Sequence, residues 1–167
     1  MSRAVLLVIA VSLFTVTLSG QSQRPSRSQQ HGKLFPPQDL GLLEAPDRDL
    51  WQPPERIMDA LGIAEASVVA DVGAGSGWFT VRLARRVGPN GIVYAQDVQA
   101  EMLSAITRRV QREGLTNVRP VLGRGNDPRF PAAAIGKLDA ILLVGTYFEI
   151  EDRVTMLRNL AAALKPG

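Results

Sequence analysis

The stretch from Asp71 to Gly77, Asp-Val-Gly-Ala-Gly-Ser-Gly, limits the fold of this chain more than any other segment. It joins an apolar run at residues 67–72 to an amphipathic run at residues 77–87 through alternating glycines. Glycine tolerates backbone angles that a side chain forbids, and the free N–H groups that open a helix favour an anion. The segment therefore predicts a strand, a cofactor-binding turn and a helix.

Apolar periodicity alternates between strand and helix along most of the chain. The expected strands lie at residues 68–72, 92–97, 118–122 and 138–144, and the expected helices at residues 53–61, 77–87, 101–113 and 153–164. The last strand does not alternate polar and apolar residues, which is typical of a parallel strand covered on both faces. The sequence predicts an α/β fold class, a doubly wound and mostly parallel sheet that binds ligands at the carboxyl ends of its strands.

The N-terminal part differs in composition from the rest. An apolar run at residues 4–18 follows Arg3 and precedes small residues, which is the layout of a secretory signal. We expect a signal peptide or membrane anchor at residues 1–20, a disordered tether at residues 21–38 and one domain at residues 39–167. Such a chain is exported or membrane-tethered, on the periplasmic side in a bacterium. It is cytoplasmic if the start codon is misassigned.

Composition excludes several classes of function. Four of the 19 lysine and arginine residues precede residue 39, so the domain holds 15 against 16 acidic residues and shows no basic nucleic-acid-binding footprint. The chain has no cysteine, and its one histidine, His31, lies in the predicted tether. Thiolate chemistry, a histidine-based triad and zinc–sulfur or multi-histidine sites are therefore excluded, and we expect no metal.

The spacing around the turn separates it from related nucleotide-binding motifs. A dinucleotide fingerprint would place its third glycine where Trp78 stands, and no Gly-Lys-Ser or Gly-Lys-Thr follows as a phosphate loop requires. Asp97 ends the next expected strand, about 20 residues beyond Gly77, where a carboxylate can accept hydrogen bonds from both ribose hydroxyls. A nucleoside ligand is therefore predicted, and the alternative role for Asp97 is a cap on the following helix.

Together these segments resemble the class I S-adenosylmethionine-dependent methyltransferase family. The resemblance covers most of residues 51–167 and rests on Asp71–Gly77, Tyr94–Asp97, Gly114–Val118, Leu138–Leu143 and Leu164–Gly167. It implies a Rossmann-like methyltransferase fold, S-adenosyl-L-methionine as cofactor and methyl transfer as the reaction. Because the family continues into a fifth strand after this point, we expect the chain to be a fragment of a longer reading frame, with the last strands missing.

The resemblance also implies roles for single residues. The turn would line the methionine moiety, with Asp71 at its amino end, and Asp97 would hold the ribose. The implied cofactor-binding residues are Asp71, Gly73, Ala74, Gly75, Ser76, Gly77, Asp97, Val98 and Asp127. For Asp127, a contact near the adenine and a simple turn role are both open.

Methyl transfer from a sulfonium is an in-line displacement in which alignment does most of the work, so a dedicated base is optional. The catalytic candidates are Tyr147 and Glu149, the groups after the fourth strand that can exchange a proton with a substrate. Related sequences often have aspartate and histidine where this chain has Gly145 and Phe148. Two hypotheses follow: a methyltransferase acting on an unidentified small-molecule or protein acceptor, and a non-catalytic exported nucleoside-binding domain of the same fold.

Overall fold

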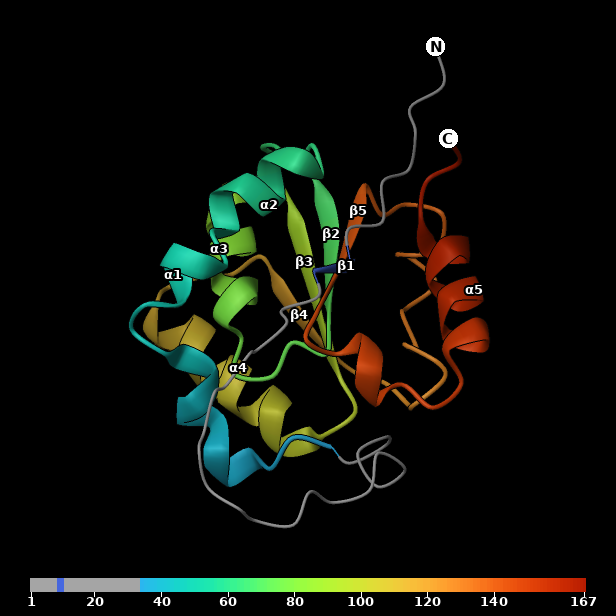
Figure 1. Ribbon diagram of the computed structural model, residues 1–167. Helices are drawn as coiled ribbons and strands as arrows, with labels where there is room; N and C mark the ends of the chain where they lie inside the picture. Colours follow the sequence, from blue (N-terminus) through green and yellow to red (C-terminus); the bar gives the residue numbers. More distant parts are fainter. Residues whose placement is uncertain (1–8, 11–33) are drawn as a thin grey trace.

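A parallel β-sheet lies between two helical layers in the computed structural model, which describes residues 9–10 and 34–167 (Figure 1). Its strands run in the order β1-β5-β2-β3-β4, and all their pairings are parallel. The strands are β1 (Ile9–Ala10), β2 (Val68–Val72), β3 (Ile92–Asp97), β4 (Val118–Leu122) and β5 (Ala140–Val144). The predicted α/β, doubly wound fold is confirmed.

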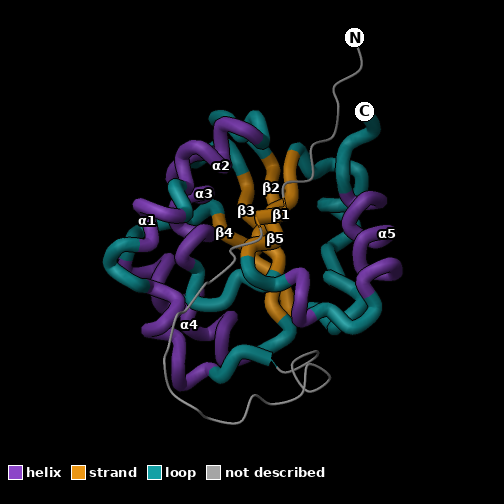
Figure 2. The backbone as a smooth tube through the Cα atoms, viewed as in Figure 1, coloured by secondary structure: helices purple, strands orange, loops and turns teal. Residues whose placement is uncertain are grey.

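Helices follow the strands in regular alternation, as the tube in Figure 2 shows. One face of the sheet carries α2 (Pro54–Ala60), α3 (Trp78–Val87) and α4 (Ala100–Arg112), and the other carries α5 (Arg153–Ala163). Three short helices were not predicted: η2 (Pro37–Glu44), α1 (Arg48–Trp51) and η3 (Tyr147–Glu149). These helices have three to eight residues, too few for a helical apolar repeat to mark them.

The strands divide their side chains between two cores. Alternate residues of one strand point to opposite faces of the sheet, so β3 sends Val93 toward α3 and α4 and sends Tyr94 toward α5. In the same way, β5 sends Leu142 to the first core and Ile141 to the second. Both faces of β5 are therefore buried, which explains the continuous apolar run that the sequence shows there.

The described residues that precede the predicted domain make a contact with it. Of the expected signal at residues 1–20 the structure describes Ile9–Ala10, and the expected tether lies outside the described residues up to residue 33. The described chain resumes at Leu34, and Gln99 Nε2 donates a hydrogen bond to the Phe35 carbonyl at 3.0 Å. Within the described ranges, no helix has both the length and the apolar character needed to cross a membrane.

Asn117, just before β4, fixes the end of α3 from across the fold. Its side chain is buried, and Nδ2 donates to the carbonyls of Ala84 at 2.8 Å and Gly88 at 2.7 Å. The last carbonyls of a helix have no partner within the helix, so a side-chain donor there satisfies groups that would otherwise be buried unpaired.

We expect Asn117→Ala to lower the free energy of unfolding by about 2–3 kcal/mol, because it removes two hydrogen bonds and leaves carbonyls without a donor. Urea unfolding of the full chain measures this change. Asn159→Ala is the matched control, since Asn159 makes one exposed hydrogen bond, to the Asn126 carbonyl. Equal effects of the two substitutions would contradict the role assigned to Asn117.

Candidate functional site

The glycine-rich turn lies between β2 and α3, at the carboxyl end of the sheet. Gly73, Gly75 and Gly77 have φ values of +70°, +54° and +79°. These values lie in the left-handed region, which glycine enters without the steric cost that a Cβ imposes. Gly77 is the last residue before α3. Because all three φ values are positive, the backbone favours glycine at all three predicted positions.

Gly73 has a second requirement that sequence analysis missed. A Cβ at this position would overlap the side chain of Thr146. Thr146 follows β5, and its Oγ1 donates a hydrogen bond to the Gly73 carbonyl at 3.3 Å. The space beside Gly73 is therefore filled by Thr146, from the loop after β5. This contact, which a side chain at position 73 would prevent, joins the ends of β2 and β5.

Asp97 ends β3 and is buried, with 6% of its surface exposed. Its Oδ2 accepts a hydrogen bond from the Gly75 N–H at 3.0 Å, and its Oδ1 accepts one from the Gln99 N–H at 3.0 Å. Burial raises the pKa of the Asp97 carboxyl above its usual value, while these N–H groups oppose the rise. One carboxylate thus holds both the turn and the segment that leads into α4.

Asp71 is fully buried under the turn. Its Oδ2 accepts a hydrogen bond from Thr80 Oγ1 at 2.6 Å. Burial raises the pKa of Asp71 to about 6; the Thr80 hydrogen bond opposes the rise and the charge of Asp97 adds to it. Sequence analysis missed Thr80. This residue lies between the apolar residues Phe79 and Val81 of a helix, and a hydroxyl in such a position is a signal for a buried hydrogen-bond partner.

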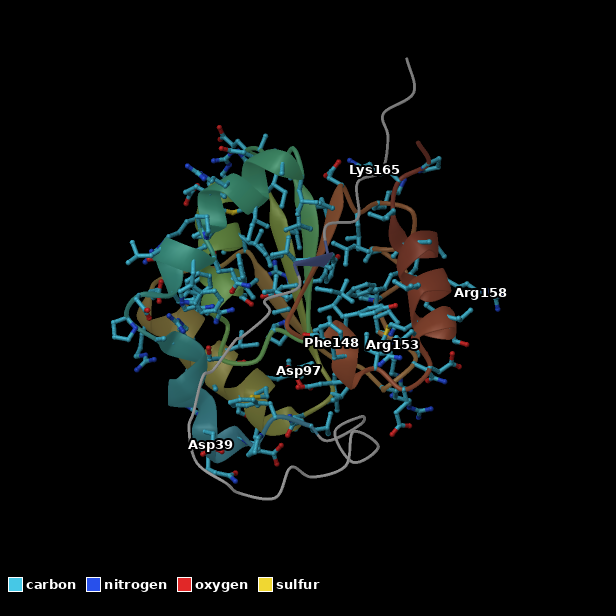
Figure 3. The ribbon with its side chains drawn as sticks, viewed as in Figure 1. Asp39, Asp97, Phe148, Arg153, Arg158 and Lys165 are labelled. Atoms are coloured by element: carbon cyan, nitrogen blue, oxygen red, sulfur yellow. The ribbon has the colours of Figure 1, made fainter. Side chains whose placement is uncertain are left out.

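A cavity of about 170 Å³ opens at the carboxyl ends of β2, β3 and β5. Five of the predicted site residues line it: Gly73, Gly75, Asp97, Val98 and Glu149. The rest of its wall is mainly apolar and includes Phe35, Val72, Met102, Val144, Ile150 and Met156. Figure 3 shows Asp97 at the end of the molecule opposite Lys165, with Phe148 and Arg153 on its α5 side.

A second, smaller cavity of about 50 Å³ lies on the other side of the turn. The predicted residues Asp71, Ala74 and Ser76 line it together with Trp78. The indole ring packs edge-on against Phe79, with ring centroids 4.8 Å apart. Guanidinium groups cover it as well, with Cζ of Arg48 at 4.1 Å and Cζ of Arg82 at 3.7 Å from the ring centroid. Trp78 therefore packs beside the turn, and the larger cavity stays clear of the indole.

Three predicted residues line neither of these two cavities: Gly77, Asp127 and Tyr147. Asp127 lies on a separate surface hollow, and its Oδ1 accepts a hydrogen bond from the Arg129 N–H at 2.8 Å. Its carboxylate and the bridge between Arg124 and Asp127 stabilise the turn of this loop, and Gly125 of the same loop lines the cavity. The implied contact of Asp127 with the adenine stays a prediction. Tyr147 instead packs near Arg153, whose Cζ lies 5.3 Å from the ring centroid.

Gln96 is a cavity residue that sequence analysis did not identify. It is 1% exposed, and its Oε1 accepts a long hydrogen bond of 3.4 Å from the Gly73 N–H. Its Nε2 has no hydrogen-bond partner in the part of the chain that the structure describes. This nitrogen is sealed from solvent and packs against Gly123, where a Cβ would overlap it. The structure thus tolerates one buried donor without a partner, at a cost of about 1–3 kcal/mol.

These features define a class of protein. A parallel sheet, a glycine turn after one strand and a carboxylate at the end of the next form a Rossmann-like domain that binds a nucleoside cofactor at the carboxyl ends of its strands. The two acceptor oxygens of Asp97 fit such a cofactor, which offers ribose hydroxyls as donors.

Comparison with known proteins narrows the class. The methyltransferase domain family matches residues 69–167. The chain is 32% identical to nocamycin O-methyltransferase of Saccharothrix syringae, over 75% of this chain and 44% of that protein. It is 28% identical to demethylmenaquinone methyltransferase of Geobacillus stearothermophilus, over 66% and 46%. A S-adenosylmethionine-dependent methyltransferase structure from Aquifex aeolicus is 32% identical with a TM-score of 0.73, covering 80% of this chain and 69% of that one.

The chain belongs to the S-adenosylmethionine-dependent methyltransferase family, as its turn and strand ends predicted. It spans about half the length of the curated relatives it matches.

The burial of Asp71 predicts a pH dependence of stability. Because its pKa is about 6 in the folded chain and 3.8 as the ordinary value, the folded state favours the protonated acid. The resulting stability is present below about pH 4 and is lost as the pH rises through about 6. Between about pH 4 and pH 7, we expect wild type to lose about 2–3 kcal/mol relative to Asp71→Asn, which keeps an acceptor oxygen for Thr80.

Urea unfolding of both chains across this pH range measures the difference. Two parallel pH profiles would show that Asp71 does not titrate as its burial requires.

Proposed function

We propose that this protein transfers a methyl group from S-adenosyl-L-methionine to a small, largely apolar acceptor. One observation carries the proposal: Asp97 and Gly75, joined by a hydrogen bond, line the same cavity as Glu149 from the loop after β5. The cavity therefore combines predicted cofactor-binding groups from β2 and β3 with a wall from β5 that belongs to the acceptor side.

The residues of this chain have separate tasks in such a reaction. Asp97 would accept hydrogen bonds from the ribose, and Val98 and Met102 would give apolar contact beside it. S-adenosylmethionine supplies an already activated methyl group, so the protein has to align the two reactants and exclude water. Glu149 is half-buried, and burial raises the pKa of its carboxyl above the usual value, which favours uptake of a proton that a hydroxyl acceptor loses.

The wall of the cavity supports a small apolar acceptor. Ile150 and Met156 come from the α5 side, and Phe35 comes from the N-terminal segment. Two of the curated relatives are named for small organic molecules, a demethylmenaquinone and nocamycin, which supports a small-molecule acceptor, although another relative is named for tRNA. All three are methyltransferases, so the non-catalytic alternative is not favoured. Labelled methyl transfer into the organic-soluble fraction of a cell extract supports the enzyme, whereas binding without transfer supports the alternative.

Titration calorimetry with S-adenosylhomocysteine tests the cofactor site. We expect saturable binding to the wild-type chain, and Asp97→Ala to weaken it by about 1–3 kcal/mol because a charge-assisted hydrogen bond to the ribose is lost. Glu151→Ala is the matched control, since Glu151 is exposed and does not line the cavity, so this substitution should leave the affinity unchanged. Absence of binding to a folded wild-type chain, or equal losses in both variants, would rule out the assigned site.

We also propose that residues 1–20 direct the chain to export or to a membrane. The support is the apolar run at residues 4–18 after Arg3. A fusion of residues 1–38 to alkaline phosphatase, which is active after export, should give phosphatase activity in bacteria. An inactive phosphatase fusion beside an active cytoplasmic reporter fusion would contradict the proposal, and replacing two apolar residues of the run by arginine provides the control.

A further inference from the structure

The charged side chains that line the larger cavity, Asp97 and Glu149, are both acidic. Asp97 lies at the end of β3 and Glu149 lies in η3, after β5, and no lysine or arginine lines the cavity among the residues that the structure describes. The two carboxylates interact: after burial, the charge of Asp97 is the next cause that raises the pKa of Glu149. Charges interact more strongly in a partly buried cavity than in water, so the ionised pair gives this cavity a negative potential.

Glu149 lies beside the N-terminal segment. The backbone of Phe35 lowers the pKa of the Glu149 carboxyl, against the effect of burial. The Phe35 carbonyl in turn accepts the hydrogen bond from Gln99, on the opposite side of the cavity. Leu34 and Phe35 also line the cavity wall. Glu149 therefore lines the cavity together with the N-terminal segment.

Nearby cations do not cancel this potential. Arg153 donates to the carbonyls of Tyr147 at 3.1 Å and Phe148 at 3.2 Å and does not line the cavity. On the outer face of α3 and α4, arginine side chains form ion pairs with acidic residues instead: Arg82 with Asp49, Arg85 with Glu113, Arg86 with Glu55, and Arg109 with Glu44.

We propose that Glu149 selects the cationic methyl donor over its neutral product. This inference rests on the proposed function. In the transfer, the bond between the methyl carbon and sulfur breaks, its electron pair stays on sulfur, and the acceptor forms the new bond to carbon. The sulfonium thereby becomes an uncharged thioether. A carboxylate at the cavity wall attracts the donor and loses this attraction when the product has formed, so Glu149 is a specificity-determining residue that favours donor entry and product release.

The affinities of three ligands test the assignment: S-adenosylmethionine, S-adenosylhomocysteine and sinefungin, which has an ammonium group in place of the sulfonium. Calorimetry is done at about pH 8 on wild type and Glu149→Gln, a substitution that removes the charge and keeps the shape of the side chain. We expect the variant to bind S-adenosylmethionine and sinefungin about 10-fold more weakly and S-adenosylhomocysteine with less than about twofold change.

Glu151→Gln is the matched control, because it removes the same charge from an exposed position two residues further along the chain. It should leave all three affinities unchanged. An unaltered ratio of donor to product affinity in Glu149→Gln, or sinefungin following the product instead of the donor, would overturn the inference. Failure of the wild-type chain to bind any of the three ligands would instead contradict the proposed function.

Salt provides a second measurement on the wild-type chain, independent of whether the variant folds. Between about 50 mM and 500 mM salt, the affinity for S-adenosylmethionine should fall more than the affinity for S-adenosylhomocysteine, because screening weakens the attraction to a charge. Identical salt dependence of the two ligands would also count against the role of Glu149.

Discussion

Two buried carboxylates at the carboxyl end of the sheet hold the elements around the site in place. A carboxylate is tolerated in the interior only where donors satisfy its oxygens. Asp97, at the end of β3, finds them in the backbone N–H groups of Gly75 and Gln99, and Asp71, in β2, finds one in the hydroxyl of Thr80. Asp97 thereby holds the turn after β2 and the segment that leads into α4, and Asp71 holds α3. The shape of the cavity depends on these few bonds.

The glycines of the turn belong to the same constraint. Their positive φ values let the Gly75 N–H point at Asp97, and the missing side chain of Gly73 lets Thr146 reach the turn from the loop after β5. The ends of β2, β3 and β5 are therefore joined by side chains as well as by the sheet. The raised pKa of Asp71 shows that this arrangement puts a carboxylate where its charge is disfavoured.

The sequence predicted those parts of the fold that repeat locally. The strand at residues 68–72 agrees with β2, because a short, largely apolar run between turns marks it. Contacts between distant residues left no such mark. Asn117 and Ala84 lie 33 residues apart, and Gln99 and Phe35 lie 64 apart, so no window of sequence contains both partners. Glycine spacing predicted the turn and Asp97, but the polar partners Thr80 and Gln96 depend on how the sheet faces pack.

The acidic and basic residues of the domain nearly cancel in number. The carboxylates of Asp97 and Glu149 line the cavity, however, whereas many arginines lie on the outer face of α3 and α4. Arginines of α3 and α4 pair outward with acids of the N-terminal helices, as Arg82 does with Asp49 of α1 and Arg109 with Glu44 of η2. Such partly exposed ion pairs contribute about 0–1 kcal/mol each and weaken in salt. The segment from Phe35 toward the core is held by these ion pairs, by the Arg48 guanidinium over the Trp78 ring and by the hydrogen bond from Gln99 to the Phe35 carbonyl. The cavity therefore combines a floor held by the buried hydrogen bonds of Asp71 and Asp97 with an N-terminal wall held by partly exposed contacts.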